Sequence, residues 1–470
     1  MNFTRDIVDA APPGANALVS LSGDRRRSEL TFGEIAAGAA RLAGTLTTRH
    51  VSRGDVVMTV IGNRPEWVLG LLACFRIGAV ALPCTPQLRC ADLRARMDAA
   101  EPRVVIADAS STETVRAAGF TGPVLTMPDE RLFEAPPAPA AELAPDDPAL
   151  IVFTSGTSGA PKPIRHGQRY LTGQSVQAQH WFGARAGDLA WCTAASGWSK
   201  SARNSFIAPW LRGAAALLHD GRFDAEERLD IVERERVNVL CMAPTEYRTI
   251  AKRARLRPLG PLRHAVSAGE ALNPEVIELW QERVGVAVHD GYGQTETGAL
   301  TGMPLGEPVR PGSMGRPLPG LRVWVEEGEL CADPASVPTF FLGGGPGPWH
   351  TGDRVREDED GYMWFEGRSD DVIISAGYRI GPFEVESALV SHPAVAEAAA
   401  VAAPDDERGQ VVRAVVVLQE GSHAGPRLAR ELQDHVKQRT APYKYPRIVD
   451  FAADLPKTAS GKVRRADLRQ

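Results

Sequence analysis

The sequence predicts an α/β protein in two parts, a large N-terminal domain and a smaller α+β C-terminal domain. The chain has 470 residues, and a single hydrophobic core stops growing well below that length. Apolar strand patterns alternate with amphipathic helix patterns, which is typical of parallel sheets flanked by helices. Beyond about residue 370 the pattern begins again with a short strand, a helix and further strands.

The first α/β unit shows this alternation clearly. Val56–Ile61 is a short apolar run that predicts a strand. Asn63 is a suitable N-cap for the following helix, and Pro65 stands in its first turn, where a missing N–H does no harm. Val80–Pro83 predicts the next strand, so the unit favours a parallel pair. The same pattern predicts strands at Val104–Ala107, Leu150–Phe153, Ala215–His219, Val237–Cys241 and His264–Ser267.

Two helix starts carry capping signals. Thr31 precedes Glu34 by three residues, which is the capping-box spacing, and apolar residues then follow at helical intervals. Asp224 precedes Glu227 in the same way. We therefore expect helices that begin directly after Thr31 and Asp224.

Changes of pattern indicate the domain organisation. Ala135–Pro148 is rich in proline and alanine and predicts a linker. Leu321–Glu326 and Glu329–Cys331 alternate and predict antiparallel strands, a small β-barrel-like part of the large domain. We expect an N-terminal domain at 1–369 and a C-terminal domain at 370–470. The second contains predicted strands at Val372–Ser375, Ala396–Ala402 and Val411–Leu418, and helices at Phe383–Val390 and Leu428–Arg439.

Composition excludes several classes of protein. The net charge is −5 with acidic and basic residues interspersed, so no basic stripe predicts a nucleic-acid partner. The N-terminus has no apolar signal region, and the apolar runs are too short for a transmembrane segment. The six cysteines form no C-x-x-C pair, which favours small buried thiols in a reducing compartment. We expect a cytoplasmic protein, either a monomer or a homodimer.

The segment Leu150–Lys162, LIVFTSGTSGAPK, carries the strongest chemical signal. A buried strand enters a loop of glycines and hydroxyls that ends in Pro-Lys. Glycines let backbone N–H groups approach an anion closely, and the lysine adds positive charge. The spacing differs from that of P-loop kinases and NTPases, so a phosphate-binding loop of another class is predicted.

With this loop the sequence resembles the adenylate-forming superfamily, which includes acyl-CoA synthetases, luciferases and adenylation domains of peptide synthetases. Four further segments match the motifs of that superfamily in the same order. They are DGYGQTETG at Asp290–Gly298, WHTGD at Trp349–Asp353, GRSDDVIISAGYRIGPFEVE at Gly367–Glu386 and LPKTASGKVRR at Leu455–Arg465. The resemblance implies an ATP-dependent acid–thiol ligase, most similar to medium-chain acyl-CoA and acetyl-CoA synthetases. Its substrates would be a small carboxylic acid, ATP and CoA, with Mg²⁺ as cofactor.

The motifs also have a plausible chemistry of their own. Tyr292 offers a flat face to adenine, Thr295 a hydroxyl to the α-phosphate, and Glu296 a hard oxygen ligand to Mg²⁺. Asp353 can accept hydrogen bonds from both ribose hydroxyls. The resemblance implies a wider ATP- and AMP-binding set: Thr154, Ser155, Gly156, Thr157, Ser158, Gly159, Lys162, Gly269, Glu270, Ala271, Asp290, Gly291, Tyr292, Gly293, Gln294, Thr295, Asp353, Arg368, Arg379 and Lys462.

By resemblance, the C-terminal domain is a mobile lid. Lys462 is implied to bridge the acid and the α-phosphate, which makes it catalytic with Thr295 and Glu296. Asp370 matches the hinge, about which the lid rotates before the thiol attacks. CoA is implied to contact Ser375, Ala376, Gly377, Tyr378, Arg408 and Lys444.

The acid itself is less well defined. Ser196–Trp210, SGWSKSARNSFIAPW, looks most like the medium-chain branch, and Trp198, Met242 and Gly293 are candidates for the acyl pocket. The short N-terminal region and the compressed Cys331–Pro348 segment depart from that branch. A short- to medium-chain acid, a small branched or hydroxy acid, and an aryl acid all stay open.

Three other functions compete with an acyl-CoA synthetase. A stand-alone adenylation enzyme would load an acid onto a carrier protein, but Gly197–Lys200 offers no acidic residue to hold an amino-acid substrate. A luciferase-type oxygenase would share every motif and would require a special substrate. A non-catalytic binding protein would be expected to have lost at least one of Thr295, Glu296, Asp353, Arg379 and Lys462.

Overall fold

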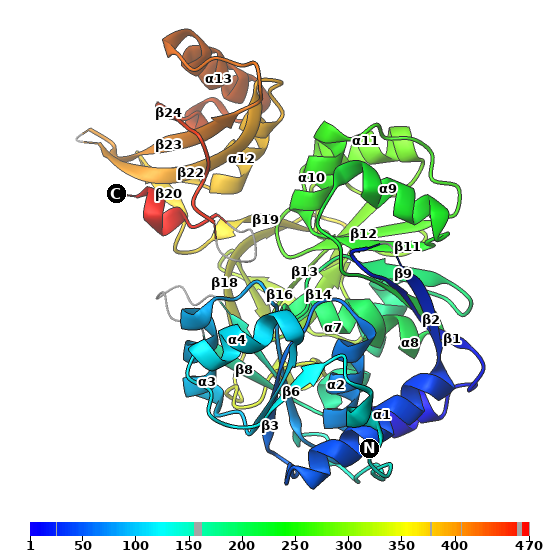
Figure 1. Ribbon diagram of the computed structural model, residues 1–470. Helices are drawn as coiled ribbons and strands as arrows, with labels where there is room; N and C mark the ends of the chain where they lie inside the picture. Colours follow the sequence, from blue (N-terminus) through cyan, green and yellow to red (C-terminus); the bar gives the residue numbers. More distant parts are fainter. Residues whose placement is uncertain (25, 155–161, 377, 406, 458–462, 470) are drawn as a thin grey trace.

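The computed structural model describes the whole chain except residues 25, 155–161, 377, 406, 458–462 and 470. Two large, mainly parallel sheets form the body (Figure 1). The larger has nine strands in the order β15-β14-β13-β12-β11-β9-β10-β1-β2, and its six central strands run parallel. Their bounds are β1 Asn16–Leu21, β2 Arg27–Thr31, β9 Leu189–Cys192, β10 Ala215–His219, β11 Val239–Met242, β12 His264–Ala268, β13 Val288–Gln294, β14 Gly298–Gly302 and β15 Arg316–Pro317.

The second sheet has the order β6-β5-β3-β4-β7-β8. Its strands are parallel except β8, which pairs antiparallel with β7 on either side of the loop 155–161. The mainly parallel sheet predicted from the β-α-β units is therefore confirmed. The bounds are β3 Val56–Val60, β4 Val80–Cys84, β5 Val104–Asp108, β6 Val124–Met127, β7 Pro148–Thr154 and β8 Lys162–Gly167.

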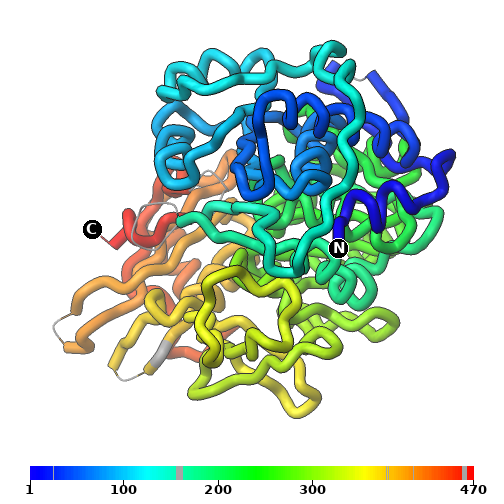
Figure 2. Tube along the Cα trace, turned by 90° about the horizontal axis from the view of Figure 1, so that it is seen from below, coloured from blue at the N-terminus to red at the C-terminus, as the bar shows by residue number. Residues whose placement is uncertain are grey.

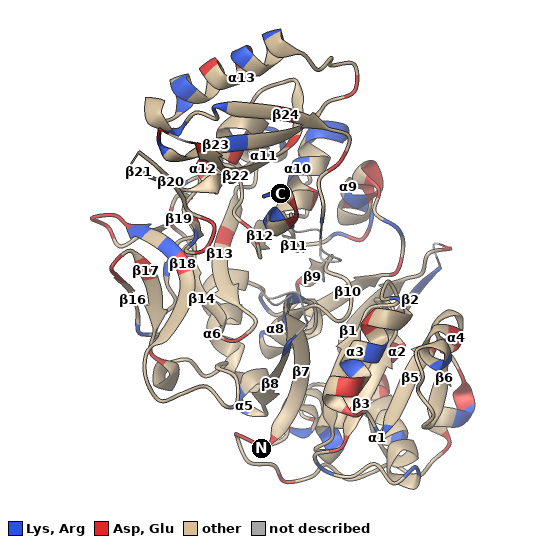
Figure 3. Ribbon diagram, turned by 90° about the vertical axis from the view of Figure 1, so that its left-hand side faces the viewer, with Lys and Arg blue, Asp and Glu red and all other residues tan. Residues whose placement is uncertain are grey.

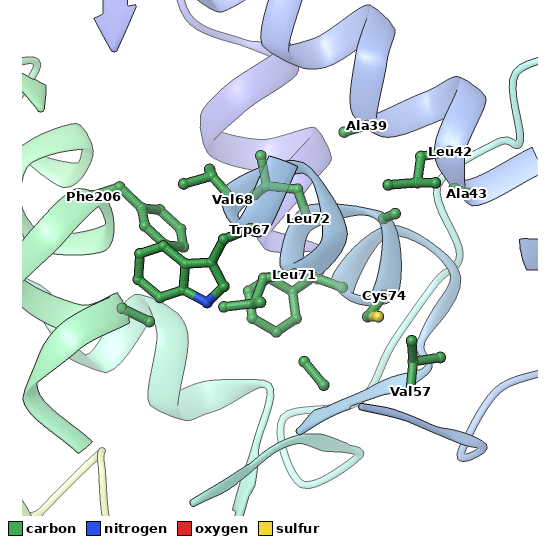
Figure 4. Close-up of a cluster of buried hydrophobic side chains, with 14 of the residues drawn as sticks. Ala39, Leu42, Ala43, Val57, Trp67, Val68, Leu71, Leu72, Cys74 and Phe206 are labelled. Carbon is green, nitrogen blue, oxygen red and sulfur yellow. The ribbon is translucent and has the colours of Figure 1, made fainter. Parts of the chain in front are cut away.

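Helices lie between the two sheets and on both outer faces. The central layer has α1 Phe32–Thr48, α2 Pro65–Ile77, the π-helix η4 Arg203–Ile207 and α8 Ala208–Leu211, and these join both sheets in one core. Trp67 of α2 meets Phe206 of η4 edge-to-face at 5.7 Å between centroids (Figure 4). The outer helices are α3 Cys90–Ala100, α4 Ala109–Ala117, α9 Ala225–Arg234, α10 Pro244–Arg253 and α11 Pro274–Val284.

Shorter helices complete the body. They are η1 Thr4–Asp9, η2 Glu130–Phe133, α5 Arg169–Gly173, α6 Ser175–Gln177, η3 Ala178–Phe182, α7 Ser199–Ala202 and η5 Pro334–Ser336.

The predicted helix caps agree with the structure except at one position. The Thr31 hydroxyl accepts from the N–H of Glu34 at 3.3 Å, and Asp224 accepts from the N–H of Glu227 at 2.9 Å. In helix α2, however, Arg64 occupies the N-cap position and its side chain makes no capping hydrogen bond, so the expectation for Asn63 is wrong. Asn63 instead donates to the carbonyl of Ala194 at 3.1 Å and accepts from the N–H of Ser196 at 2.8 Å. The Asn63 side chain therefore forms a tertiary contact between the two sheets and does not cap the helix.

The predicted linker is irregular and packs against α1. The N–H of Ala138 donates to the carbonyl of Ala40 at 2.9 Å. A side chain at Gly44 would come within 2.0 Å of the carbonyl oxygen of Pro136.

The last part of the body is a four-stranded antiparallel sheet in sequence order. It agrees with the predicted antiparallel strands and closes over the edge of the nine-stranded sheet through Tyr292, which packs in both adjoining apolar clusters. Its strands are β16 Val323–Glu326, β17 Glu329–Ala332, β18 Trp349–Glu357 and β19 Met363–Arg368.

The C-terminal elements form a separate α+β unit with its own core beside the body (Figures 1 and 2). A β20–β21 hairpin precedes a three-stranded sheet, β22-β23-β24, covered by two helices. The bounds are β20 Ile373–Ser375, β21 Tyr378–Ile380, α12 Pro382–Val390, β22 Val395–Asp405, β23 Gly409–Leu418, α13 Pro426–Arg439, η6 Pro442–Lys444, β24 Ile448–Ala452 and η7 Arg465–Leu468.

Charged residues of both signs are distributed over the ribbon (Figure 3). No helix in the described ranges is both long enough and apolar enough to cross a bilayer.

Candidate functional site

The motifs predicted to bind ATP meet at one edge of the nine-stranded sheet. Strands β9, β11, β12 and β13 are parallel neighbours, so their carboxyl ends lie side by side. Gly269–Ala271 follows β12, and Asp290–Gly298 forms the end of β13 and the turn into β14. In open α/β sheets, ligands bind outside the carboxyl ends of the strands. This edge is therefore the candidate active site.

Asp353 is the centre of the hydrogen-bond network at this edge. It lies in β18 and is 5% exposed. The hydroxyl of Tyr292 donates to one carboxylate oxygen, and the side-chain amide of Gln294 donates to the same oxygen at 2.9 Å. Arg368 pairs with the other oxygen at 3.3 Å. Four predicted site residues from three strands are thus brought together.

The same contacts fix how Tyr292 and Gln294 sit. Trp349 donates its indole N–H to the side-chain oxygen of Gln294 at 3.0 Å, which orients the amide. Burial raises the pKa of Tyr292 well above its ordinary value, and the charge of Asp353 adds to this effect. Tyr292 is therefore a neutral donor that holds the carboxylate in place. Its predicted contact with adenine stays a prediction.

Asp290 lies beneath the site. It is 4% exposed, and its carboxylate accepts from the N–H of Gly291 at 3.0 Å and of Leu272 at 3.4 Å. Burial raises the pKa of Asp290 to about 8, and the two N–H donors offset only part of that effect. Asp290 joins the end of β13 to the segment after β12, so its role in this structure is to position both.

Glu270 is engaged by helix α10. Its carboxylate accepts from Thr245 and pairs with Arg248, both at 3.0 Å. Gly269 has a φ of +108°, a region that L side chains rarely adopt, and the ammonium of Lys200 lies 3.4 Å from where a Cβ would stand. The backbone of Gly269–Ala271 is thus held in a fixed path along the sheet edge.

The phosphate-binding loop falls largely outside the described residues. Thr154 ends β7 and pairs with Lys162, which begins β8 with an exposed side chain. Ser155, Gly156, Thr157, Ser158 and Gly159 lie in the segment that is not described. The strand predicted before this loop is present.

Thr295 and Glu296 occupy the β13–β14 turn. Both are partly exposed, and the backbone of Glu296 is held by the N–H of Phe341 at 2.9 Å. A partly exposed carboxylate of this kind suits Mg²⁺, which prefers hard oxygen ligands and keeps several waters. One group of possible metal ligands lies elsewhere in the described part of the chain, on the small β-sheet: Glu326, Cys331 and His350.

The candidates for the acyl pocket do not lie together. Trp198 is partly exposed and lines a small hollow with Pro83, Thr85 and Phe153, close to the end of β7. Met242 is 1% exposed in the core against α9–α11, because alternate residues of β11 face opposite sides of the sheet. A side chain at Gly293 would come within 1.9 Å of the carbonyl oxygen of Gly298, so this glycine serves the tight hairpin.

The predicted CoA-contacting residues gather at the β20–β21 hairpin. Ser375 is 8% exposed, and Ala376 has a φ of +49° with its N–H donated to the carbonyl of Arg408 at 3.1 Å. Tyr378 is 53% exposed and stacks on Tyr443 at 4.3 Å between centroids. Tyr443 was not among the predicted residues. The sequence signal that could have predicted Tyr443 was its position beside Lys444 in a segment of aromatic and basic residues.

Lys444, on the same face of the unit, pairs with Glu384. Gly377 lies outside the described residues. Arg379 belongs to β21, and nothing is described of its side chain.

The hinge candidate Asp370 lies where the body and the C-terminal unit join. Its carboxylate pairs with Arg368 at 3.3 Å, and its carbonyl accepts from Arg469 at 3.2 Å. Arg465 pairs with Glu386 at 2.7 Å, and its charge also interacts with Glu270 of the body. Lys462 lies outside the described residues, and Arg465, in the segment that follows it, lies near Glu270 at the ATP-site edge.

Two basic residues near the site were also missed. Lys200 donates to the carbonyl of Ala268 at 3.1 Å, and Arg203 is 6% exposed. The signal for them was two cations three residues apart in the otherwise uncharged Ser196–Trp210 segment.

Comparison with known proteins supports the assignment of these motifs. A family model described as AMP-binding enzyme matches residues 6–338, and one described as AMP-binding enzyme C-terminal domain matches 384–462. The chain belongs to the AMP-binding enzyme family. This finding confirms the predicted superfamily and the two-part fold.

Individual relatives are similar over nearly their whole length. An acyl-CoA ligase described as uncharacterized, YtcI of Bacillus subtilis, is 39% identical over 92% of this chain and 88% of its own. The mitochondrial acyl-coenzyme A synthetase ACSM3 of Mus musculus is 36% identical over 100% of this chain and 90% of its own. The anthranilate CoA ligase AuaEII, solved in complex with anthranoyl-AMP, has a TM-score of 0.91 and 27% identity, with 100% and 96% of the two chains covered. The prediction of an acyl-CoA synthetase is therefore confirmed.

Proposed function

We propose that this acyl-CoA synthetase activates a short- to medium-chain or small branched or hydroxy acid with ATP and Mg²⁺, and transfers the acyl group to CoA. The observation that carries the proposal is the network around Asp353. It joins β13 to β18 and β19 next to the Thr295 turn, which supports a ribose-binding role for Asp353.

In the first half-reaction, an oxygen of the acid attacks the α-phosphorus of ATP, and the bond to pyrophosphate breaks. Asp353 would accept both ribose hydroxyls, while the fixed backbone of Gly269–Ala271 and the ring of Tyr292 would flank the adenine. Thr295 would donate to the α-phosphate, and Lys462 with Arg379 would stabilise charge that grows in the transition state. Mg²⁺ held by Glu296 would neutralise charge on the departing phosphates.

In the second half-reaction, the sulfur of CoA attacks the acyl carbonyl, its thiol proton is lost, and the bond to AMP breaks. We infer that residues 370–470 turn about Asp370 for this step and bring the β20–β21 hairpin to the site. We infer that the arrangement in this structure serves the first half-reaction, because Arg465, in the segment that follows Lys462, lies near Glu270 at the sheet edge. Tyr378 and Tyr443 meanwhile remain exposed.

We further propose a cytoplasmic location and a site for the phosphates of CoA. The cysteines are all free, which fits a reducing cytoplasm. Arg408 and Lys444 are proposed to face the phosphates of CoA, since they flank the hairpin.

The test is pyrophosphate release from ATP and Mg²⁺ with a panel of acids, each assayed with and without CoA. The panel runs from acetate to decanoate and includes branched, hydroxy and benzoate-type acids. Sustained turnover that requires CoA is the expected result. A stoichiometric burst that CoA does not relieve would point to a carrier protein as the acceptor, and no acid-dependent release would overturn the proposal.

A further inference from the structure

Two cations occupy the short segment that follows β9. Lys200 lies in α7 and Arg203 begins η4. The residues from Ser201 to Ile207 are all buried. Arg203 is 6% exposed. The π-helical turn at Arg203–Ile207 is itself notable, because single π-turns occur frequently at functional sites.

Arg203 lacks an anionic partner in the part of the chain that the structure describes. No carboxylate of a described residue lies within ion-pair distance of it, and its Nε and Nη1 atoms have no hydrogen-bond partner among those residues. A buried guanidinium without a counter-charge costs several kcal/mol of stability. Stability alone therefore does not explain an arginine at this position.

The polar groups around Arg203 are neutral. The Tyr170 hydroxyl lies next to Arg203 and to the side chain of Gln174, and both side chains are buried with no other polar partner among the described residues. Burial, helped by the positive charge of Arg203, lowers the pKa of His166 to about 3, so its imidazole is uncharged at neutral pH. These groups can solvate a bound anion, but none of them neutralises Arg203.

The two cations lie at the sheet edge where the acid must arrive. The ammonium of Lys200 is bound to the carbonyl of Ala268, whose strand partner is Gly291 in the next strand. Arg203 is followed by Asn204, which donates to the sulfur of Cys241 at the end of β11 at 3.7 Å. On its other side, His166 lies against the backbone of Thr295, the turn proposed to hold the α-phosphate.

The segment is also held rigidly. Phe206 packs on Trp67 (Figure 4), and Gln177 donates to Asn204 at 3.0 Å. A cation fixed in this way is pre-organised for a ligand rather than free to move into solvent.

We propose that Arg203 is a specificity-determining residue that binds a second carboxylate at the far end of the acid, with Lys200 assisting nearer the reacting end. The substrate class is then a short dicarboxylic acid that is activated at one carboxylate only. A guanidinium suits this role because it pairs with a carboxylate through two parallel hydrogen bonds. This inference rests on the proposed function and narrows its substrate.

The test compares acids of equal chain length that differ in the second carboxylate. Butyrate, succinate and monomethyl succinate form one set, and hexanoate, adipate and monomethyl adipate another. The expected result is a kcat/KM at least about tenfold higher for one diacid than for its monoacid and its monoester, the lower end of what a charge-assisted hydrogen bond contributes.

The variant Arg203→Met distinguishes a role of Arg203 in binding the second carboxylate from a role in stabilising the fold. We expect the variant to lose that preference through a fall of about tenfold or more for the diacid, with the monoacid changed by less than about threefold. Arg203→Lys should keep part of the preference. Arg212→Met, at an exposed arginine just beyond α8, should leave the ratio unchanged. A purely structural role would lower the activity on both acids together.

Several outcomes decide the matter. If the wild type turns over monoacids but prefers no diacid, this inference fails while the proposed function stands. If no acid supports CoA-dependent turnover, the proposed function itself fails. If Arg203→Met does not fold, the Lys200→Met variant and the wild-type acid panel still test the inference. A wild type with the same kcat/KM for a diacid and for its monoacid contradicts it.

Discussion

At the scale of single residues, the site depends on how Asp353 is held. Tyr292, Gln294 and Arg368 all direct hydrogen atoms at its carboxylate, so its position is fixed before a nucleotide arrives. Preorganised groups of this kind bind without reorganising at the moment of reaction.

Asp353→Ala should therefore raise the KM for ATP at least about tenfold, since hydrogen bonds to charged groups contribute about 1.5–3 kcal/mol. The KM for the acid should change little. Steady-state kinetics with each substrate varied in turn measures both values. Asp360→Ala, which removes an exposed carboxylate paired with Arg310, is the matched control. An unchanged KM for ATP would remove Asp353 from the ribose site.

Asp290 gives a prediction about pH. Burial raises its pKa to about 8, above the ordinary value of 3.8. Between these two values the folded protein binds a proton that the unfolded chain does not, so stability falls as pH rises, with a slope of at most about 1.4 kcal/mol per pH unit. Asp290→Asn removes the titration. Thermal unfolding from pH 5 to pH 8 should show the melting temperature of the wild type falling relative to that of the variant. Parallel curves would mean that Asp290 is ionised in the fold.

At the scale of elements, helix α10 connects the site to the C-terminal unit. Its first turn holds Glu270 through Thr245, and its last turn carries Lys252, which donates to the carbonyls of Val395 and Ala396 in β22, both at 2.9 Å. One helix thus contacts both the proposed adenine segment and the proposed lid.

Lys252→Met should weaken the lid arrangement that serves the first half-reaction. We expect the rate of acyl-adenylate formation to fall about three- to tenfold, since two hydrogen bonds of a charged donor at a partly exposed contact are lost. Pyrophosphate exchange measures this rate, and Arg253→Met on the same turn is the control. Equal rates in both variants would show that this contact does not hold the lid.

The elements themselves were largely predictable, because they follow from local patterns. The Thr31 and Asp224 caps, the parallel strands and the C-terminal α+β unit all agree with the structure. What could not be predicted depends on tertiary partners. The side chain of Asn63 does not cap helix α2 but bonds to Ala194, which follows β9 of the nine-stranded sheet. Met242 faces the core, and the sequence alone does not show which side of β11 faces the site.

The candidate site shows the same division. The resemblance implied one site for Asp353, Tyr292, Gln294 and Arg368, and the structure brings these side chains together because several strand ends meet at one edge. Their contacts with ATP stay predictions. Arg203 was missed, because only the packed structure reveals that no carboxylate in the described chain neutralises it. A buried cation is visible in a sequence only as a basic residue in an apolar segment, and that pattern also occurs at surfaces.

At the scale of the whole molecule, we propose that one site serves two half-reactions and that the C-terminal unit turns between them. This unit lies beside the body (Figures 1 and 2), with Arg465 near Glu270 of the body and with Tyr378 of the β20–β21 hairpin exposed. Each half-reaction then needs a different face of the same unit.

The most direct measurement separates the half-reactions in Lys462→Ala. Acid-dependent pyrophosphate exchange should be reduced at least about a hundredfold, since a charge aimed at the transition state is lost. Acyl-CoA formation from supplied acyl-AMP should stay within about threefold of the wild-type rate. Equal loss in both assays, or full pyrophosphate exchange in the variant, would contradict the account of a single site served in turn by two faces of the lid.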